Sequence, residues 1–403
     1  MVGLLFLFFL FWPFGAVVYS IKNYKGLATK NVVWLFVIYY GFNFVLSNDT
    51  MDANRLKDKF EVFLNADFGF FEVIKVFYLN RKDGVDIIQQ IVLYLAAKIT
   101  DDFYILMGLL GGIFGFFYSR NIGYLFDHAG GKIKIYNYLI IWMFVFVIGF
   151  WQINAFRYWT SAVIYFFAVA PYIVENKKGN LWLAPATIFL HFSFLYANLI
   201  LLIYILLRNR ANLYFAFYMV SFFLVTVNVS EVGQLLTNLL PSNYHRKILA
   251  YTDGAYVAEI EESVKSISYY LRFLMFFFLN LTFTIIYLKK RRQIKEHHDL
   301  FSLFSFCLLI MAAANFISII PSGIRFVYLS STFSFGFIFL YLQRFRPTGV
   351  LKVVLNASVP FFLLGSFGFI RNGMDTIGVL TLFGNPLISA LVDYRVALIE
   401  FFR

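Results

Sequence analysis

Two ionisable side chains stand out in a chain that is otherwise dominated by apolar residues. Arg157 stands between two long apolar runs, three residues after Asn154. His191 interrupts a later apolar run at the sequence His191-Phe192-Ser193. An ionisable side chain beside or inside a membrane segment is costly and is therefore a functional-site hypothesis. The chemistry open to these residues depends on the side of the membrane that they face.

Three arginines could bind phosphate. Arg157, Arg325 and Arg371 each stand at one end of an apolar run, and all three ends are expected on the outer side. A guanidinium group is always charged, and its planar fork of donors fits phosphate oxygens in a bidentate way. Converging arginines would suit a lipid-linked phosphate or pyrophosphate. The alternative is that each arginine is a flanking residue whose long stem carries its charge to the headgroups.

Other polar residues offer acid-base or binding chemistry. A neutral His191 could take a proton from a sugar hydroxyl or hydrogen-bond a substrate, or it could be a packing residue. Asp49 and Asp52 could act as a base or hold a metal, although solvated loop carboxylates are the simpler interpretation. Arg246, in the sequence Tyr244-His245-Arg246-Lys247, could contact sugar or phosphate or lie in an exposed loop.

Composition indicates a membrane protein. The 403 residues are 61% hydrophobic, 22% aromatic and only 14% charged. Runs of about 17 to 25 apolar residues, long enough to cross roughly 30 Å of hydrocarbon, recur along the chain. The sequence therefore predicts an all-α, polytopic transmembrane helical bundle of about ten to twelve spans. No linker divides the chain, so residues 1–403 are expected to form one integral membrane domain.

The expected spans follow from the apolar runs. The first run lacks a basic start and a small-residue cleavage site, so it is expected to be a retained span rather than a signal peptide. The spans are expected at residues 2–20, 32–46, 103–118, 135–151, 158–174, 214–229, 270–288, 301–320, 324–342 and 353–370, with a further apolar segment at 181–207.

The distribution of charge assigns the sides. Lys and Arg favour short cytoplasmic loops. The segments assigned to the cytoplasm hold about half of the 34 Lys and Arg and few acids, and Lys289-Lys290-Arg291-Arg292 anchors the assignment. The net charge of +12 is thus explained by loop charge and not by a nucleic-acid partner. The cytoplasmic segments are 21–31, 119–134, 175–180, 208–212, 289–299 and 344–352.

The segment from Leu181 to Leu207 is too long for one perpendicular span and has basic residues at both ends. Both ends should therefore share one side, which two passes with His191 at the turn would satisfy. Ten residues of helix reach only about 15 Å, so the first arm would be a half-span. Such a broken segment is tolerated only where protein or water covers its backbone. One long tilted span is the alternative.

Three segments are expected on the outer side. Residues 47–102 carry several acids and then an apolar-polar mixture from Asp86 to Ile99 that could lie in the interface as an amphipathic helix. Residues 230–269 combine leucines with a polar face, and the tail spans 371–403. The first two are expected to form ordered caps over a membrane cavity.

Small residues and the single cysteine carry less chemistry. No phosphate-cradling P-loop pattern occurs, and Gly111-Gly112, with Gly115 nearby, is expected to allow close helix packing. Cys307 lies in an apolar run, which excludes an internal disulfide and a cysteine cluster for metal. We expect no metal and no other cofactor.

Two motifs carry a family resemblance. The run Phe156-Arg157-Tyr158-Trp159-Thr160-Ser161-Ala162, a basic turn and then Phe189-Leu190-His191-Phe192-Ser193 resemble the EpsG-like family of bacterial polysaccharide polymerases, relatives of the Wzy O-antigen and capsule polymerases. Ile324-Arg325-Phe326-Val327-Tyr328 is similar to a later motif of that family. One departure lies in the first outer loop, where an Asp-Tyr-x-x-Tyr element is replaced by Asn48-Asp49-Thr50-Met51-Asp52.

The resemblance implies a location, substrates and roles. The protein would lie in the bacterial cytoplasmic membrane with an outward-facing site. It would polymerise undecaprenyl-pyrophosphate-linked repeat units into O-antigen, capsule or exopolysaccharide, alongside flippase and chain-length regulator proteins. Arg157 would stabilise the departing pyrophosphate, and His191 or Asp52 would deprotonate or orient the acceptor hydroxyl. Arg325, Arg371, Asn154, Arg246, Asp49 and Tyr328 would bind substrate.

Three alternatives remain open at this level. A GT-C-like glycosyltransferase using a polyprenyl-phosphate sugar would use an outer-loop aspartate, Asp49 or Asp52, as base. A lipid-linked glycan flippase would carry cationic residues along a path through the spans. A membrane acyltransferase could use His191 as base, but its donor is normally cytoplasmic. Fold analogy alone does not choose among them.

Overall fold

The structure is a computed structural model that describes residues 2–21, 26–47, 51–65, 69, 72, 86–223, 237–238, 267–318 and 322–402. Within these ranges the chain is α-helical, with two isolated β-bridges and no strand. The predicted all-α class is therefore confirmed. Helices of the bundle include α3 (Leu27–Phe42), α7 (Phe103–Asp127), α8 (Ile135–Val147), α9 (Phe156–Glu175), α12 (Ala211–Phe223), α16 (Ile267–Ile285), α18 (His298–Ser318), α19 (Ile324–Arg344) and α20 (Gly349–Met374).

Six helical stretches of the described chain are long and apolar enough to cross a membrane. They are Phe103–Asp127, Ile135–Glu175, Tyr270–Lys295, His298–Ser318, Ile324–Arg344 and Gly349–Met374. The chain is therefore a multi-pass helical membrane protein. The expected ten to twelve spans exceed these six because the larger number counts Ile135–Glu175 as two spans and includes shorter apolar helices, such as α3 and α12.

The 41-residue stretch Ile135–Glu175 turns back on itself. The break lies at Ile148 and the 3-10 helix η2 (Phe150–Ala155), between α8 and α9. Both ends of the stretch lie beside the end of α7, near residues 128–129. Lys134, before α8, donates its backbone N–H to Gln343, whose side chain donates to the carbonyl of Ala129. Glu175, at the end of α9, lies 3.3 Å from His128 Nε2. The stretch therefore makes two passes, as predicted.

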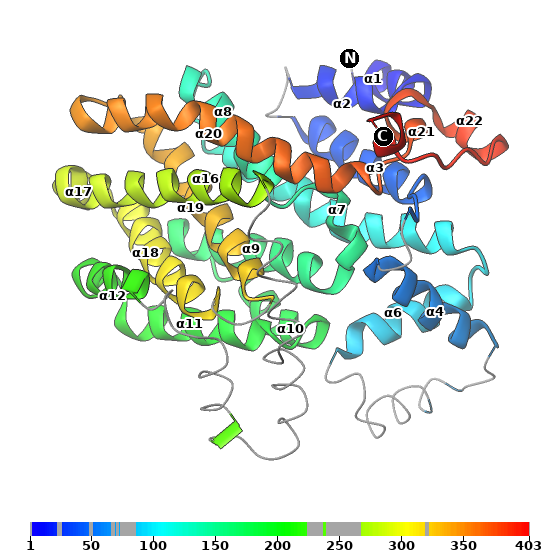
Figure 1. The fold of residues 1–403 in the computed structure, drawn as a ribbon, viewed down its shortest axis with the longest axis horizontal. Coiled ribbons are helices and arrows are strands. Elements are labelled where there is room, and N and C mark those ends of the chain that lie inside the picture. The colour runs from blue at the N-terminus through cyan, green and yellow to red at the C-terminus, as the bar shows by residue number, and fades with distance from the viewer. Residues whose placement is uncertain are drawn as a thin grey trace.

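The two ends of the bundle lie on opposite sides of Figure 1. The short helix α17 (Arg291–Lys295) lies at the left-hand end, and α4 (Asp52–Asn65) and α6 (Ile87–Ala97) lie at the right-hand end. Helix α17 begins within the basic cluster that the charge bias assigns to the cytoplasm. The end that carries α4 and α6 is accordingly the one expected to face outward.

The segment from Leu181 to Leu207 folds as a helical hairpin, which confirms the two-pass prediction. Its arms are α10 (Leu183–Leu190) and α11 (Phe194–Leu207). Asn198, one turn into α11, donates from Nδ2 to the carbonyl of Ala184 at 3.0 Å, near the start of α10. A continuous helix would hold these residues about 20 Å apart, so the contact requires antiparallel arms. His191 has extended backbone angles and forms the turn.

The first apolar run is not one continuous span, contrary to prediction. It is broken at Trp12 into α1 (Val2–Phe11) and α2 (Pro13–Ser20). Pro13 has no N–H to donate and disfavours helical angles at the residue before it. The rings of Phe8 in α1 and Tyr19 in α2 lie 6.1 Å apart, which shows that the two helices fold back on each other. Trp12 donates from its indole nitrogen to the carbonyl of Leu382 in the tail.

Helices α3 and α7 pack closely, as the glycine pattern predicted. A Cβ atom at Gly111 would lie 2.6 Å from the carbonyl oxygen of Val37, and one at Gly41 would lie 2.3 Å from that of Met107. Only glycine allows such backbone contact. The approach fixes α3 against the start of α7, beside the outer end of the bundle.

The tail after α20 packs against the first helices. An isolated β-bridge pairs Phe44 with Ile377, and the hydroxyl of Tyr39 donates to the carbonyl of Leu380. The tail also contains α21 (Val379–Phe383) and α22 (Pro386–Leu391). Figure 1 shows both termini at the upper right of the bundle. This packing ties the end of the chain to its beginning.

Candidate functional site

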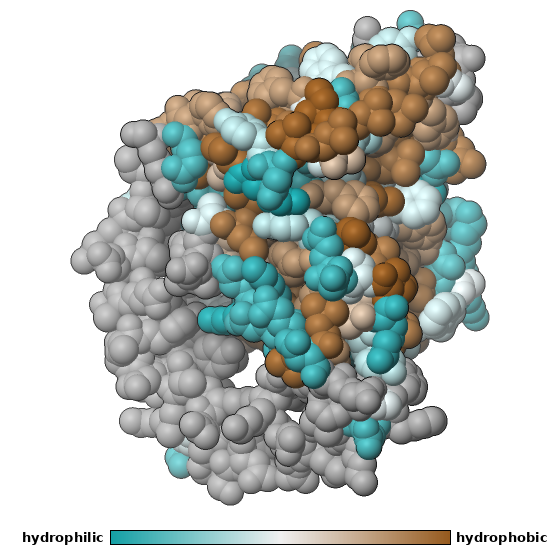
Figure 2. All heavy atoms as spheres, turned by 90° about the vertical axis from the view of Figure 1, so that its right-hand side faces the viewer, coloured by the Kyte–Doolittle hydropathy of each residue, from teal (hydrophilic) through white to brown (hydrophobic). Residues whose placement is uncertain are grey.

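Five of the predicted site residues line one cavity at the α4–α6 end. The cavity has a volume of about 410 Å³, within the range of small-molecule sites. Its walls come from α4, η2, the start of α9, the hairpin turn and the start of α19. Figure 2 views this end and shows hydrophilic side chains gathered among apolar ones. Among the predicted residues, the lining includes Asp52, Asn154, Arg157, His191 and Arg325.

Arg157 is fixed by a carboxylate that sequence reasoning did not single out. Asp86 accepts a hydrogen bond from Arg157 Nη1 at 2.6 Å through one oxygen and from the backbone N–H of Phe192 at 2.9 Å through the other. Its side chain is only 11% exposed, against 36% for Arg157. Asp86 therefore ties the start of α9 to the hairpin turn. The rest of the guanidinium fork stays available to the cavity.

Arg325 approaches the cavity from α19. Its guanidinium lies over the ring of Tyr158, 5.6 Å from the ring centre. Its Nη2 is 3.9 Å from one carboxylate oxygen of Asp52. The other Asp52 oxygen lies 3.6 Å from Nη1 of Arg55. These long, partly exposed ion pairs are weak. A ligand anion could compete with them for Arg325.

His191 forms the floor of the hairpin turn and is held by Ser193. Its Nδ1 lies 2.7 Å from Ser193 Oγ and 3.3 Å from the backbone nitrogen of Ser193. A backbone N–H can only donate, so Nδ1 is the acceptor and a neutral ring carries its proton on Nε2. The pKa of His191 is lowered to about 4, chiefly by burial and then by the charges of Arg157 and Arg325, while the nearby acids Asp86 and Asp52 oppose the shift. This neutral tautomer is a hydrogen-bond donor at Nε2 and not a free base there.

Two buried polar groups on the cavity wall have no hydrogen-bond partner in the described part of the chain. They are Oε1 of Gln89, a residue 5% exposed, and the hydroxyl of Tyr158, a residue 2% exposed. Buried polar atoms are almost always bonded, so each such atom needs an explanation. Ligand hydroxyl groups would satisfy both. Asn154, by contrast, already accepts a hydrogen bond from the backbone N–H of Ala53 at 3.1 Å and so holds the start of α4.

The charge on the cavity wall is positive. Four basic side chains, Arg55, Lys59, Arg157 and Arg325, face two acids, Asp52 and Asp58. No group of three His, Cys, Asp or Glu residues that could hold a metal occurs in the ranges that the structure covers. The arrangement suits an anionic ligand that also carries hydroxyl groups.

The expected convergence of three arginines holds for two of them. Arg371 is not part of the cavity wall and pairs with Asp375 one turn later, at 2.9 Å. An arginine and an aspartate four residues apart lie on one helix face, so this local pair competes with a distant ligand. Tyr328 also lies outside the wall, because its ring stacks on Trp159 and its hydroxyl accepts from Arg272 at 3.3 Å.

Two further predicted residues, Asp49 and Arg246, lie outside the described residues. Sequence reasoning missed Asp86 and Gln89 as site residues. The signal available was weak, because both belong to an amphipathic stretch that looked like an interface helix. In the structure, Gln89 lies on the buried face of α6.

Comparisons with known proteins give no family. No family model, no curated protein and no solved structure matches the chain. The fold and the site together define a multi-pass helical membrane protein with an electropositive, hydroxyl-compatible cavity at one end of its bundle.

Proposed function

We propose that the chain is a glycosyltransferase of the polysaccharide-polymerase type, acting on polyprenyl-pyrophosphate-linked oligosaccharides at the outer face of a bacterial cytoplasmic membrane. The observation that supports it is the single cavity shared by Arg157, Arg325, His191 and Asp52 at the ends of membrane helices. A lipid-linked substrate keeps its tail in the bilayer, so its phosphates must be bound at this depth. Its sugars then meet the hydroxyl-compatible wall at Gln89 and Tyr158.

The chemistry is a substitution at the anomeric carbon of the donor glycan. An acceptor sugar hydroxyl forms the new C–O bond, the bond from the anomeric carbon to pyrophosphate breaks, and the bonding electrons leave with pyrophosphate. Arg157 and Arg325 stabilise the charge that develops on this leaving group. The Asp52 carboxylate is the cavity group suited to take the acceptor proton, while His191 Nε2–H orients a hydroxyl or phosphate oxygen.

Two arginine variants test the proposal, one on the cavity wall and one away from it. A deletion strain would be complemented with wild type, Arg157→Ala or Arg371→Ala at equal membrane abundance, and surface polysaccharide would be resolved by length on a gel. We expect single repeat units with Arg157→Ala and a long ladder with Arg371→Ala, because only Arg157 lines the cavity. A wild-type ladder from Arg157→Ala would refute the proposal.

A second candidate is a glycosyltransferase that uses a polyprenyl-monophosphate sugar with Asp52 as base. The observation in its favour is that Asp52 lies in the cavity and is 41% exposed. Loss of activity in Asp52→Asn, with Arg157→Ala tolerated, would favour this candidate. A flippase path is not favoured, because no Lys or Arg among the described residues is buried in the helix bundle.

A further inference from the structure

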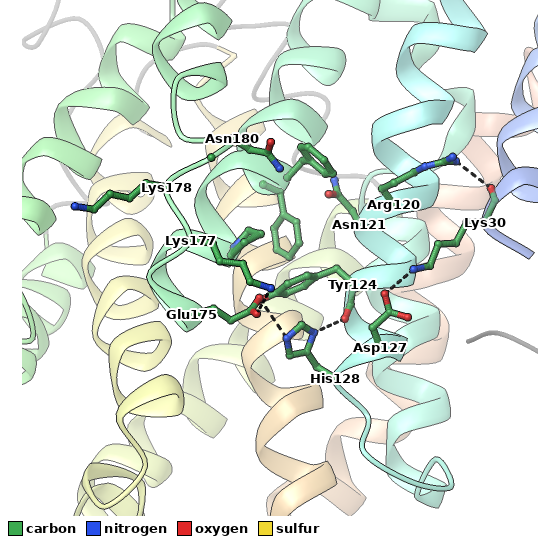
Figure 3. Close-up of a pocket in the computed structure, with 14 residues that line it drawn as sticks. Lys30, Arg120, Asn121, Tyr124, Asp127, His128, Glu175, Lys177, Lys178 and Asn180 are labelled. Atoms are coloured by element: carbon green, nitrogen blue, oxygen red, sulfur yellow. Dashed lines mark hydrogen bonds and ion pairs between the residues drawn. The ribbon is translucent and has the colours of Figure 1, made fainter. Parts of the chain in front are cut away.

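A second, larger cavity lies at the opposite end of the bundle. It has a volume of about 610 Å³ and lies between α7, the end of α9 and the loop 177–180 (Figure 3). The polysaccharide chemistry proposed above does not use it. Its position among Lys30, Lys177 and Lys178 places it at the end that the charge bias assigns to the cytoplasm.

The wall of this cavity is amphipathic. Phe166, Phe167 and Pro171 provide an apolar side. In Figure 3, Asn121 and Asn180 lie toward one end of the cavity, and Lys177, Glu175 and His128 lie toward the other. A ligand that fits must therefore present both hydrocarbon and polar groups.

Charge on the wall is again positive. Two of the four basic residues are paired, Lys30 with Asp127 at 2.5 Å and Lys177 with Glu175 at 2.6 Å. Arg120 has no acidic partner among the described residues: its guanidinium lies 4.4 Å from the ring centre of Phe116 and donates to the side-chain oxygen of Asn31. This fixed, uncompensated cation favours an anionic ligand.

Asn121 supplies an independent indication of a ligand. The residue is 3% exposed and donates from Nδ2 to the carbonyl of Val163 at 2.8 Å, across from α7 to α9. Its Oδ1 has no hydrogen-bond partner in the described structure, although it belongs to the cavity wall. A ligand hydroxyl would satisfy this acceptor, since buried polar atoms are rarely left unbonded.

We propose that this cavity binds the headgroup of an anionic glycerophospholipid from the adjoining leaflet. The phosphate lies toward Arg120 and the wall lysines, and a headgroup hydroxyl donates to Asn121 Oδ1. The part of the acyl chain nearest the headgroup covers Phe167 and Pro171. The site is independent of the proposed enzymatic function, so the failure of one does not affect the other.

The test measures lipid binding to the purified full-length chain in detergent. Dioleoyl phosphatidylglycerol and dioleoyl phosphatidylcholine would be titrated separately, and the shift of the thermal midpoint would give the half-saturating concentration. We expect phosphatidylglycerol to stabilise at concentrations where phosphatidylcholine does not, because binding to the folded state raises the midpoint. Equal effects of the two lipids would overturn the proposal, as would an equal effect of inorganic phosphate, which would reassign the cavity to a free anion.

Variants localise the effect. Asn121→Leu should raise the half-saturating concentration roughly three- to tenfold, the effect of one hydrogen bond. Asn137→Leu is the matched control, because Asn137 is also buried, donates to the carbonyl of Phe339 and has an unpartnered Oδ1, but does not line this cavity. Asn180→Ala, in the exposed loop, should weaken binding without disturbing the helices. Unchanged lipid affinity in both Asn121→Leu and Asn180→Ala would overturn the assignment.

Discussion

Asp86 connects the two residues on which the site depends. Its carboxylate accepts hydrogen bonds from Arg157 on α9 and from the backbone N–H of Phe192 in the hairpin turn, so it fixes the position of the Arg157 guanidinium relative to the His191 ring. Among the described residues it is the one acid buried at this end. In this position Asp86 orients Arg157 through one guanidinium nitrogen, and the rest of the guanidinium stays available to a ligand.

Replacing Asp86 with asparagine should therefore reduce activity although neither Arg157 nor His191 is changed. The amide cannot accept from both the guanidinium and the Phe192 N–H, and one buried donor is left unsatisfied at a cost of about 1–3 kcal/mol. We expect shortened polysaccharide and a lower thermal midpoint. Asp58→Asn, an exposed acid on the same cavity wall, is the control and should change little. Full chain length with Asp86→Asn would contradict the positioning role.

The pKa of His191 predicts a pH dependence of stability. Because burial and the two arginines lower the pKa in the folded state to about 4, the unfolded chain binds a proton more readily between about pH 4 and 6.5. Stability should therefore fall as pH falls through this window and stay level above it. The His191 contribution should be about 3 kcal/mol across the window.

Thermal midpoints between pH 4.5 and 7.5 would measure this dependence. His191→Gln keeps a hydrogen-bonding side chain without a titrating group, so its midpoint should depend less on pH than that of wild type. The opposing charges of Asp86 and Asp52 are common to both proteins and cancel in the comparison. Identical pH profiles would show that His191 is solvated and not held neutral.

At the scale of the element, two adjacent glycines of α7 should differ in how well they tolerate alanine, because only Gly111 is in backbone contact with α3. Gly111→Ala places a Cβ 2.6 Å from the Val37 carbonyl oxygen, whereas the nearest atom to a Cβ at Gly112 is 3.7 Å away. We expect Gly111→Ala to destabilise by about 1–3 kcal/mol through overpacking, and Gly112→Ala to be neutral or slightly stabilising. Unfolding of both variants in detergent tests this. Equal midpoints would mean that α3 and α7 are not in backbone contact.

Part of this architecture was predictable from the sequence. The hairpin at 181–207 followed from its length and its two basic flanks, and the close glycine contact followed from small residues at helical spacing. The break in the first apolar run was missed because hydropathy alone does not register Pro13 and Trp12. Arg371 looked equivalent to Arg157, but its nearest acid, Asp375, is one turn away on its own helix.

The Asp86–Arg157 pair was not predictable, because local pattern carries no information on contacts between distant segments. Asp86 begins an amphipathic helix, and such a residue is normally a solvated cap. Its side chain makes no capping hydrogen bond to α6 and instead reaches across to α9. An outward-facing cavity could therefore be expected, but the Asp86 carboxylate that holds Arg157 and the unpartnered Gln89 oxygen are visible only in the folded arrangement.

At the scale of the molecule, the two cavities should face opposite sides of the membrane. Cys307, the one cysteine in the chain, is 0% exposed, so added cysteines can be labelled without background. Asp58→Cys lies on the α4 side of the first cavity, and Lys178→Cys lies beside the second. A membrane-impermeant maleimide should label Asp58→Cys in intact cells and Lys178→Cys only after permeabilisation. The reverse pattern would invert the topology and remove the outward-facing site.

The most direct test of the central claim is the phosphate product of the purified protein. Wild type and Arg157→Lys would be supplied with a polyprenyl-pyrophosphate-linked oligosaccharide, and both released lipid and glycan length would be measured. We predict one polyprenyl pyrophosphate released for each glycosidic bond formed, and at least about a tenfold slower reaction in Arg157→Lys, which keeps the charge but loses the bidentate fork. Release of polyprenyl monophosphate, or an unchanged rate in Arg157→Lys, would contradict the account.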